Sequence, residues 1–119
     1  MKLIHSATIP FQIVNHAGST VKKKVLIDNG IIPTLSKFSI AVFQPGESAP
    51  SHIHESMYEV YFVDQGSITF TVSSKKIKLQ KGDCLIIEPN EPHAAINNTH
   101  SPVHLIYFGI SNERGNTTS

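Results

Sequence analysis

Three side chains that can bind a metal ion lie close together in the segment SHIHESMYE, residues 51–59. They are His52, His54 and Glu59. If this segment is extended, His52 and His54 project to the same side, because residues i and i+2 of a strand share a face. Glu59 reaches them if the turn at residues 55–57 directs the next strand toward the two imidazoles. Two histidines and a carboxylate are a donor set typical of non-haem iron, and they also suit manganese, nickel or zinc.

His93 is the expected fourth ligand. It follows the segment GDCLIIEPNEP, residues 82–92, in which a turn, an apolar run and a Pro-flanked turn could return the chain to the same site. An octahedral ion held by four protein ligands keeps two positions open for water or substrate, as Lewis-acid or oxygen chemistry requires. A purely structural metal site is a weaker alternative, because such sites usually close the coordination sphere with cysteine or further histidine.

The elements that would position these residues are short β-strands. Runs rich in β-branched and aromatic residues, or with strict polar and apolar alternation, are separated by turn residues. The predicted strands are 38–44, 58–63, 67–73, 76–79, 84–87, 93–97 and 103–108, with a hairpin turn at 73–75. No window of about 11 residues free of Pro and Gly has a helical apolar stripe. This pattern predicts an all-β sandwich or barrel.

Period two also assigns faces within the predicted strand 58–63. Glu59 and Tyr61 share one face. Tyr61 is then either an acid/base helper that reaches a bound substrate or a core aromatic whose hydroxyl has a partner. Val60 and Phe62 lie on the opposite face, which predicts that the strand is covered on both sides, by a second sheet or by a partner subunit.

Length and composition predict one soluble domain over residues 1–112, followed by a flexible tail at 113–119 that lacks apolar residues. The chain has 119 residues, of which 39% are hydrophobic. Its formal charge of +1 gives no indication of nucleic acid or an anionic membrane as a partner. The lysine run at 22–24 is interpreted as a solvated strand end or turn.

A single cysteine, Cys84, excludes an internal disulfide framework and suits a reducing compartment. The N-terminal apolar stretch is interrupted by His5, Ser6 and Pro10, so it does not resemble a signal peptide, and no segment reaches membrane-spanning length. We therefore expect a cytoplasmic protein. Cys84 itself is expected to be a small buried apolar residue, since no histidine or basic partner can be assigned to it.

The remaining histidines are expected to have other roles. We assign His5, His16 and His100 to surface or loop positions. His104 lies on the last predicted strand, where a structural role is favoured over one facing the cavity. For the ligand set itself, the alternatives are a pair of surface imidazoles and a polar core that binds no metal.

Two groups of residues resemble the motifs of the cupin superfamily. The pattern Gly46-x5-His52-x-His54-x4-Glu59-x6-Gly66 matches the first cupin motif at every fixed position, and Gly82, His93 and Asn97 match the second motif at its usual spacing. The second motif normally has Pro and Gly where this chain has Glu88 and Asn90. Asn tolerates a left-handed backbone nearly as Gly does, so the turn can be kept. The resemblance covers about residues 38–109, most of the chain.

The resemblance implies a jelly-roll β-barrel of the cupin type. It aligns His52, His54, Glu59 and His93 with the metal ligands of the family, whose members are often homodimers. The family includes isomerases and epimerases of sugar-like compounds, lyases and dioxygenases. The resemblance therefore implies a metal-dependent enzyme that acts on a small polar molecule with iron, manganese, nickel or zinc. The alternative is a ligand-binding or sensing barrel that performs no chemistry.

Overall fold

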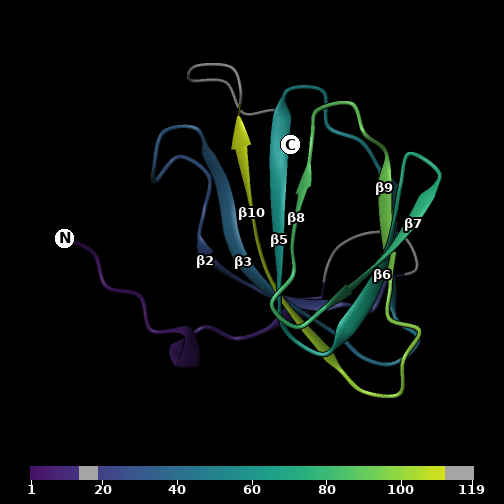
Figure 1. Cartoon of the computed structure of the whole chain (residues 1–119). Helices are drawn as coiled ribbons and strands as arrows, with labels where there is room; N and C mark the ends of the chain where they lie inside the picture. The colour runs from purple at the N-terminus through teal and green to yellow at the C-terminus, as the bar shows by residue number, and fades with distance from the viewer. Residues whose placement is uncertain (14–18, 112–119) are drawn as a thin grey trace.

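The computed structural model describes residues 1–13 and 19–111, and their regular structure is almost entirely β-strand (Figure 1). One short 3-10 turn, η1 (Ser6–Thr8), lies near the N-terminus. The strands are β1 (Gln12–Ile13), β2 (Lys22–Ile27), β3 (Leu35–Phe43), β4 (Ser48–His52), β5 (Met57–Gln65), β6 (Ser67–Val72), β7 (Lys75–Gln80), β8 (Cys84–Ile87), β9 (His93–Ile96) and β10 (Val103–Ser111). Among the described residues, no helix is long and apolar enough to cross a membrane. His16 and the tail 113–119 lie outside the described residues.

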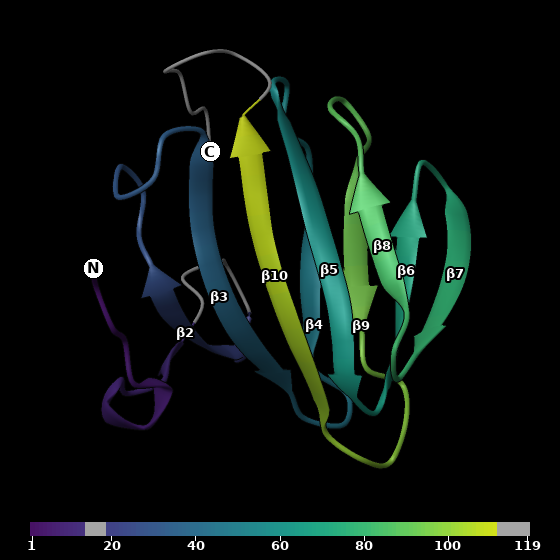
Figure 2. The same cartoon turned by 60° about the vertical axis from the view of Figure 1, so that its left-hand side comes forward.

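The strands form two antiparallel sheets, and Figure 2 shows them side by side. The six-stranded sheet has the order β1-β2-β3-β10-β5-β8, and the four-stranded sheet has the order β4-β9-β6-β7. Several neighbours are distant in sequence: β10 lies between β3 and β5, and β9 lies between β4 and β6. Such crossovers between two sheets are those of a jelly-roll barrel. The all-β prediction is therefore confirmed.

All seven predicted strands are present, with ends that differ by up to three residues. Sequence reasoning missed β1, β2 and β4. The interpretation of the lysine run at 22–24 was wrong in part: these residues open β2, and only Lys22 is exposed while Lys23 and Lys24 are partly buried. Lysine-rich strands are hard to detect from sequence, because their long aliphatic stems let a charged residue occupy a half-buried position.

The core fills the space between the two sheets. In β6, Ile68, Phe70 and Val72 are buried while the residues between them are partly exposed, as period two requires. The hairpin that joins β6 to β7 turns at Ser73 and Ser74, whose φ angles are 47° and 70°. Positive φ at both central residues is the geometry of a type I′ turn, which matches the twist of the flanking strands. The predicted hairpin is confirmed.

Asn97, which matches the second cupin motif, is fully buried and holds the ends of several strands together. Its side-chain Nδ2 donates to the carbonyl oxygens of Phe43 at 2.9 Å and Ser101 at 2.8 Å. Its Oδ1 accepts from the backbone N–H of Thr99 at 3.0 Å and from the hydroxyl of that residue at 2.7 Å. A buried amide with all of these partners satisfied stabilises the loop that leads from β9 to β10.

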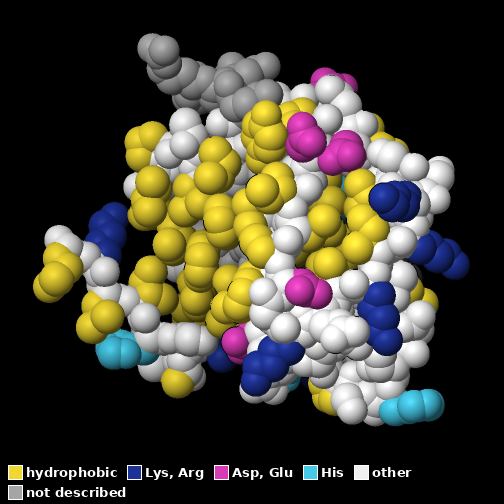
Figure 3. Space-filling model, in the orientation of Figure 1, with side chains coloured by type: hydrophobic (Ala, Val, Ile, Leu, Met, Phe, Trp, Pro, Cys, Tyr) yellow, Lys and Arg dark blue, Asp and Glu magenta, His cyan; other side chains and the backbone are white. Residues whose placement is uncertain are grey.

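Over β3, β10, β5 and β8, the outer face of the six-stranded sheet is apolar, and no described segment of the chain forms a second layer over it. On β5 the buried residues alternate with Tyr58 and Phe62, each 37% exposed. The expectation that a second sheet covers Val60 and Phe62 is therefore wrong. Figure 3 shows hydrophobic side chains gathered over this sheet, with charged side chains toward the edges of the patch.

Candidate metal centre

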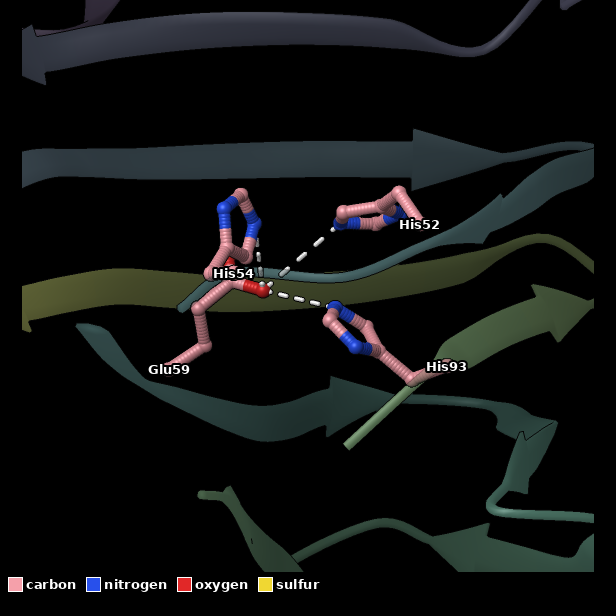
Figure 4. A group of neighbouring side chains, drawn as sticks. All are labelled: His52, His54, Glu59 and His93. Carbon is pink, nitrogen blue, oxygen red and sulfur yellow. Dashed lines mark hydrogen bonds and ion pairs between the residues drawn. The ribbon is translucent and has the colours of Figure 1, made fainter. Parts of the chain in front are cut away.

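Four side chains from three strands and one loop converge inside the barrel (Figure 4). His52 is the last residue of β4, and His93, its register partner, is the first residue of β9. His54 follows in the loop that leads to β5, and Glu59 projects inward from β5. The structure thus brings together all four residues that the sequence indicated as metal ligands.

The distances within this cluster suit a bound ion. The Oε1 atom of Glu59 lies 2.7 Å from Nε2 of His93, 3.4 Å from Nε2 of His54 and 3.7 Å from Nε2 of His52. One potential ligand atom from each residue lies within 4.8 Å of the other three. Ligands about 2.1 Å from a metal are roughly 3 Å apart when adjacent and about 4 Å apart when opposite each other in an octahedron. The four residues therefore fit a metal ion with only small adjustments.

Backbone carbonyl groups orient two of the imidazoles. Nδ1 of His93 donates to the carbonyl oxygen of Glu91 at 2.9 Å, and Nδ1 of His52 donates to that of Pro50 at 3.2 Å. Because these nitrogens carry their protons toward the backbone, the neutral rings present the lone pairs of their Nε2 atoms to the centre of the cluster. Such outer hydrogen bonds are a common feature of histidine ligands in metal sites.

Hydrogen bonds alone would leave this cluster with excess positive charge. For His93 to donate from both Nδ1 and Nε2, the ring must be a charged imidazolium. His52, whose Nδ1 also donates to the backbone, would need the same charge to donate from Nε2, so two imidazolium rings would face the single negative charge of Glu59. A metal cation removes this requirement, because three neutral rings and one carboxylate can all direct lone pairs at it. The protonation chemistry of the donor set thus favours a cation in the cluster.

The acidity of Glu59 is set by two opposing effects. Burial alone would raise the pKa of this carboxyl, but hydrogen bonds from His52, His54 and His93 outweigh burial and hold its pKa far below the ordinary range. The carboxylate is therefore ionised at neutral pH. An ionised carboxylate is the form that binds a cation.

The turn before His93 keeps its geometry despite its departures from the cupin motif. Asn90, which replaces the usual glycine, has a φ angle of 68°, so the expected left-handed backbone is present. Its backbone N–H donates to the carbonyl oxygen of His54 at 2.7 Å. The side chain of Glu91 accepts from the N–H of Glu88 at 2.8 Å and closes the turn. This turn therefore ties the loop that contains His54 to the strand that contains His93.

The cluster lies in the wall of a cavity of about 380 Å³ between the sheets. Its apolar wall includes Val21, Ala41, Phe43, Met57, Phe70 and Leu105. Two tyrosines, Tyr61 and Tyr107, also line it, with their rings stacked at 5.4 Å between centroids. The Tyr61 hydroxyl donates to Oε1 of Glu59 at 3.2 Å. Burial and then the charge of Glu59 raise the pKa of Tyr61 well above its usual value, and burial raises that of Tyr107 to about 12.

Other residues singled out in the sequence lie away from the cavity. Cys84 is exposed, so the expectation that it is buried was wrong. Cys84 lies on the edge strand β8 and pairs with Phe62 of β5, at a place where none of the described segments forms a layer over the outer face. His5 and His100 are exposed, as expected. His104 is partly buried on β10 and does not line the cavity, whereas the side chain of its neighbour Leu105 points inward.

Sequence reasoning missed several residues of the cavity wall, namely Lys23, Ser36, Lys37 and Tyr107. Period two could have indicated Lys37, because it shares a face with Ser39 and Ala41 if the predicted strand is extended by one residue. Lys23 could not be found in this way, since the strand that positions it was not predicted.

This fold and site define a jelly-roll barrel with a polar cluster suited to a metal ion at its centre. Residues 39–109, more than half of the chain, match the family model of the cupin domain. The chain belongs to the cupin family. It is also 27% identical over 66 residues to an uncharacterized protein of Methanocaldococcus jannaschii, covering 56% of this chain and 53% of that protein. The match thus spans about half the length of this curated relative.

Solved structures share the fold over most of the chain. One is a predicted oxalate decarboxylase from Thermotoga maritima, with 22% identity, a TM-score of 0.82, and coverage of 92% of this chain and 99% of that chain. Another is the polyketide cyclase RemF from Streptomyces resistomycificus, with 22% identity, a TM-score of 0.80, and coverage of 100% and 87%. A sugar phosphate isomerase of the cupin superfamily from Silicibacter pomeroyi has 16% identity, a TM-score of 0.77, and coverage of 92% and 75%. At these identities the likeness shows the fold.

The first prediction concerns the metal content. His93→Gln removes the most buried imidazole of the cluster, and we expect it to reduce bound metal by at least tenfold because one of four ligands is lost. Elemental analysis of untagged protein, purified without chelators, measures this directly. His100→Gln is the matched control, since His100 is exposed and belongs neither to the cluster nor to the cavity wall, and it should leave the metal content unchanged. Equal metal in both variants would show that His93 is not a ligand.

The second prediction concerns pH. Free imidazole takes up protons below about pH 6.5, and a protonated ring cannot bind metal, so we expect metal release as the pH falls below about 6. Folding lowers the pKa of Glu59, whose value in the unfolded chain is about 4.3. The carboxylate therefore stabilises the folded state above that pH, and this contribution is lost only as the pH falls below it. A chromogenic chelator and circular dichroism should therefore record metal release before unfolding. Metal retained in full at pH 5 would contradict the three-histidine site.

Proposed function

We propose that this chain is a metal-dependent cupin enzyme that acts on a small polar molecule inside the barrel. The proposed ligands are His52, His54, Glu59 and His93. One observation carries this proposal: three Nε2 atoms point at one carboxylate oxygen in the wall of a cavity. Iron, manganese, nickel and zinc all suit these donors. A bound ion would act as a Lewis acid toward a substrate oxygen, or as a site for dioxygen, at positions that the four ligands leave open.

The chain supplies the surroundings that such chemistry needs. The apolar side chains of the cavity exclude bulk water, which strengthens electrostatic interactions with a bound molecule. We propose Tyr61 as a hydrogen-bond donor to the substrate or as an acid/base helper. Its raised pKa keeps the hydroxyl protonated, and its contact with Glu59 fixes the hydroxyl beside the cluster.

The class of reaction is the open part of this proposal. The three structural relatives are described as a decarboxylase, a cyclase and an isomerase, and so one fold supports different chemistries. The reactions to test are those that the cupin resemblance implies: isomerisation or epimerisation of a sugar-like compound, lyase chemistry and dioxygenation. The identity of the bound metal determines which assay to use: oxygen uptake for iron, and isomerase and lyase screens for zinc, nickel or manganese.

We further propose that the protein works in the cytoplasm. The exposed thiol of Cys84 suits a reducing compartment, where it would stay unoxidised.

The third prediction tests the proposed catalytic role. Tyr61→Phe removes the hydroxyl beside Glu59 and keeps the ring, so we expect unchanged metal content and a fall in kcat of roughly 10- to 100-fold in whichever assay detects turnover. Tyr58→Phe is the matched control, because Tyr58 lies on the outer face of the same strand. A Tyr61→Phe variant with full kcat would remove Tyr61 from the mechanism. Tight binding of a compound without turnover would instead indicate a ligand-binding or sensing barrel.

We also propose that the protein is a homodimer joined through the outer face of the six-stranded sheet. Register pairs align outward-facing apolar residues across four strands: Phe38, Ile40, Tyr58, Val60, Phe62, Ile86, Ile106, Phe108 and Ile110. None of these residues is charged. In a twofold dimer the same patch meets itself, and an uncharged apolar patch can do so without burying like charges against each other.

The fourth prediction follows from this interface. Phe62 is exposed in the single chain, so Phe62→Lys should fold normally but place a buried charge in the dimer, and we expect it to raise the dimer dissociation constant by at least tenfold. Sedimentation equilibrium measures this. Ile96→Lys, at an equally exposed isoleucine on the four-stranded sheet, is the matched control. A wild-type protein that is monomeric at micromolar concentration would overturn the proposed interface.

A further inference from the structure

Two lysines face the cavity from strands that supply none of the four residues of the cluster. On β2, Lys23 pairs with Ala41, a buried residue of the inner face, and so its side chain points inward. Its neighbours on the strand point the other way: Lys22 is exposed, and the Nζ of Lys24 donates to the carbonyl oxygen of Ser6. Lys23 therefore lines the cavity while the other two lysines of the run do not.

The second lysine reaches the cavity at an irregularity of β3. The register between β3 and β10 pairs Phe38 with Phe108 and Leu35 with Ile110, which leaves Ser36 and Lys37 opposite the single residue Gly109. Such a bulge redirects side chains. Lys37 and Ser36 both line the cavity as a result, so a hydroxyl accompanies the ammonium group.

These two positive charges have no carboxylate in contact. In the part of the chain that the structure describes, the ion pairs join only Glu59 to its three histidines. Burial and then repulsion from Lys37 lower the pKa of Lys23, while the charge of Asp28 has a smaller effect in the opposite direction. Two like charges that repel each other in the wall of a partly apolar cavity destabilise the empty fold, and an anion between them would relieve the repulsion.

From this geometry we infer a subsite for the anionic group of a small acid, formed by Lys23 and Lys37 with the Ser36 hydroxyl as a further donor. This inference rests on the proposed function, since it concerns the substrate of the same site. The lysines would hold a carboxylate or phosphate group while another oxygen of the same molecule faces the metal cluster. Glu59 offers one negative charge against a divalent ion and two ammonium groups, so the loaded cavity would have a net positive charge. Such a cavity selects anions over neutral molecules of the same shape.

The residues of this subsite and those of the metal cluster lie in different parts of the sequence. Lys23, Ser36 and Lys37 all lie outside residues 39–109, the segment that matches the cupin domain, whereas all four residues of the cluster lie inside it. The subsite would thus set the specificity of the cavity rather than its metal chemistry.

The test uses isothermal titration calorimetry on the full chain loaded with zinc. Malonate is compared with the neutral malonamide, and glycerol 3-phosphate with glycerol, so that the two arms distinguish a carboxylate from a phosphate. We expect at least one anion to bind in preference to its neutral partner. Lys23→Gln and Lys37→Gln should each weaken this binding roughly 10- to 100-fold, because each removes a charge-assisted hydrogen bond. Lys22→Gln, one residue away but exposed, is the matched control and should bind as the wild type does.

Metal content, measured on every variant, separates this inference from the proposed function. If the protein holds metal but neither anion binds in preference to its neutral partner, or if the two lysine variants bind as tightly as Lys22→Gln, the subsite is overturned while the metal centre stands. If the wild type takes up no metal but still prefers anions in a lysine-dependent manner, the subsite stands and the proposed enzyme does not.

Discussion

The rest of the barrel must supply hydrogen-bonding and charged partners for the buried, ionised carboxylate of Glu59. A buried charge is tolerated only where partners replace the water that it has lost. Glu59 projects from the six-stranded sheet, while two of its partners, His52 and His93, belong to the four-stranded sheet. Because packed sheets lie about 10 Å apart, side chains as long as Glu and His must each span roughly half of that distance to meet. The contact therefore couples the separation of the sheets to the geometry of the site.

The loops beside the cluster complete this coupling. The carbonyl groups of Pro50 and Glu91 orient the two rings, and the bond from Asn90 to the His54 carbonyl joins the two ligand loops directly. Pro50 and Pro92 fix the backbone at these carbonyl groups, and this reduces the number of conformations that the two loops can adopt. The backbone thus orients the rings of His52 and His93.

The same period of two that builds the cavity also creates the apolar outer face. On β5 every residue that faces the cluster or the core is followed by one that faces outward, and β3 and β10 follow the same rule through their shared register. A strand that is apolar on both faces needs cover on both. The described residues provide this cover on one side only, and so the outer face and the cavity are two consequences of one pattern.

The sequence by itself determined seven of the ten described strands, the inward and outward faces of β5, and the four residues that converge. These features depend on local alternation and on short spacings, such as the single residue between His52 and His54. Asn90 keeps the turn because its own backbone preference allows a positive φ angle. Only the tertiary structure decided that Cys84 is exposed on an edge strand, and that Lys23 on β2 meets Ser36 and Lys37 of β3 in the wall of one cavity. The reason is physical: strand order, edge position and the bulge opposite Gly109 arise from pairing between segments distant in the chain. Local periodicity contains no information about such pairing.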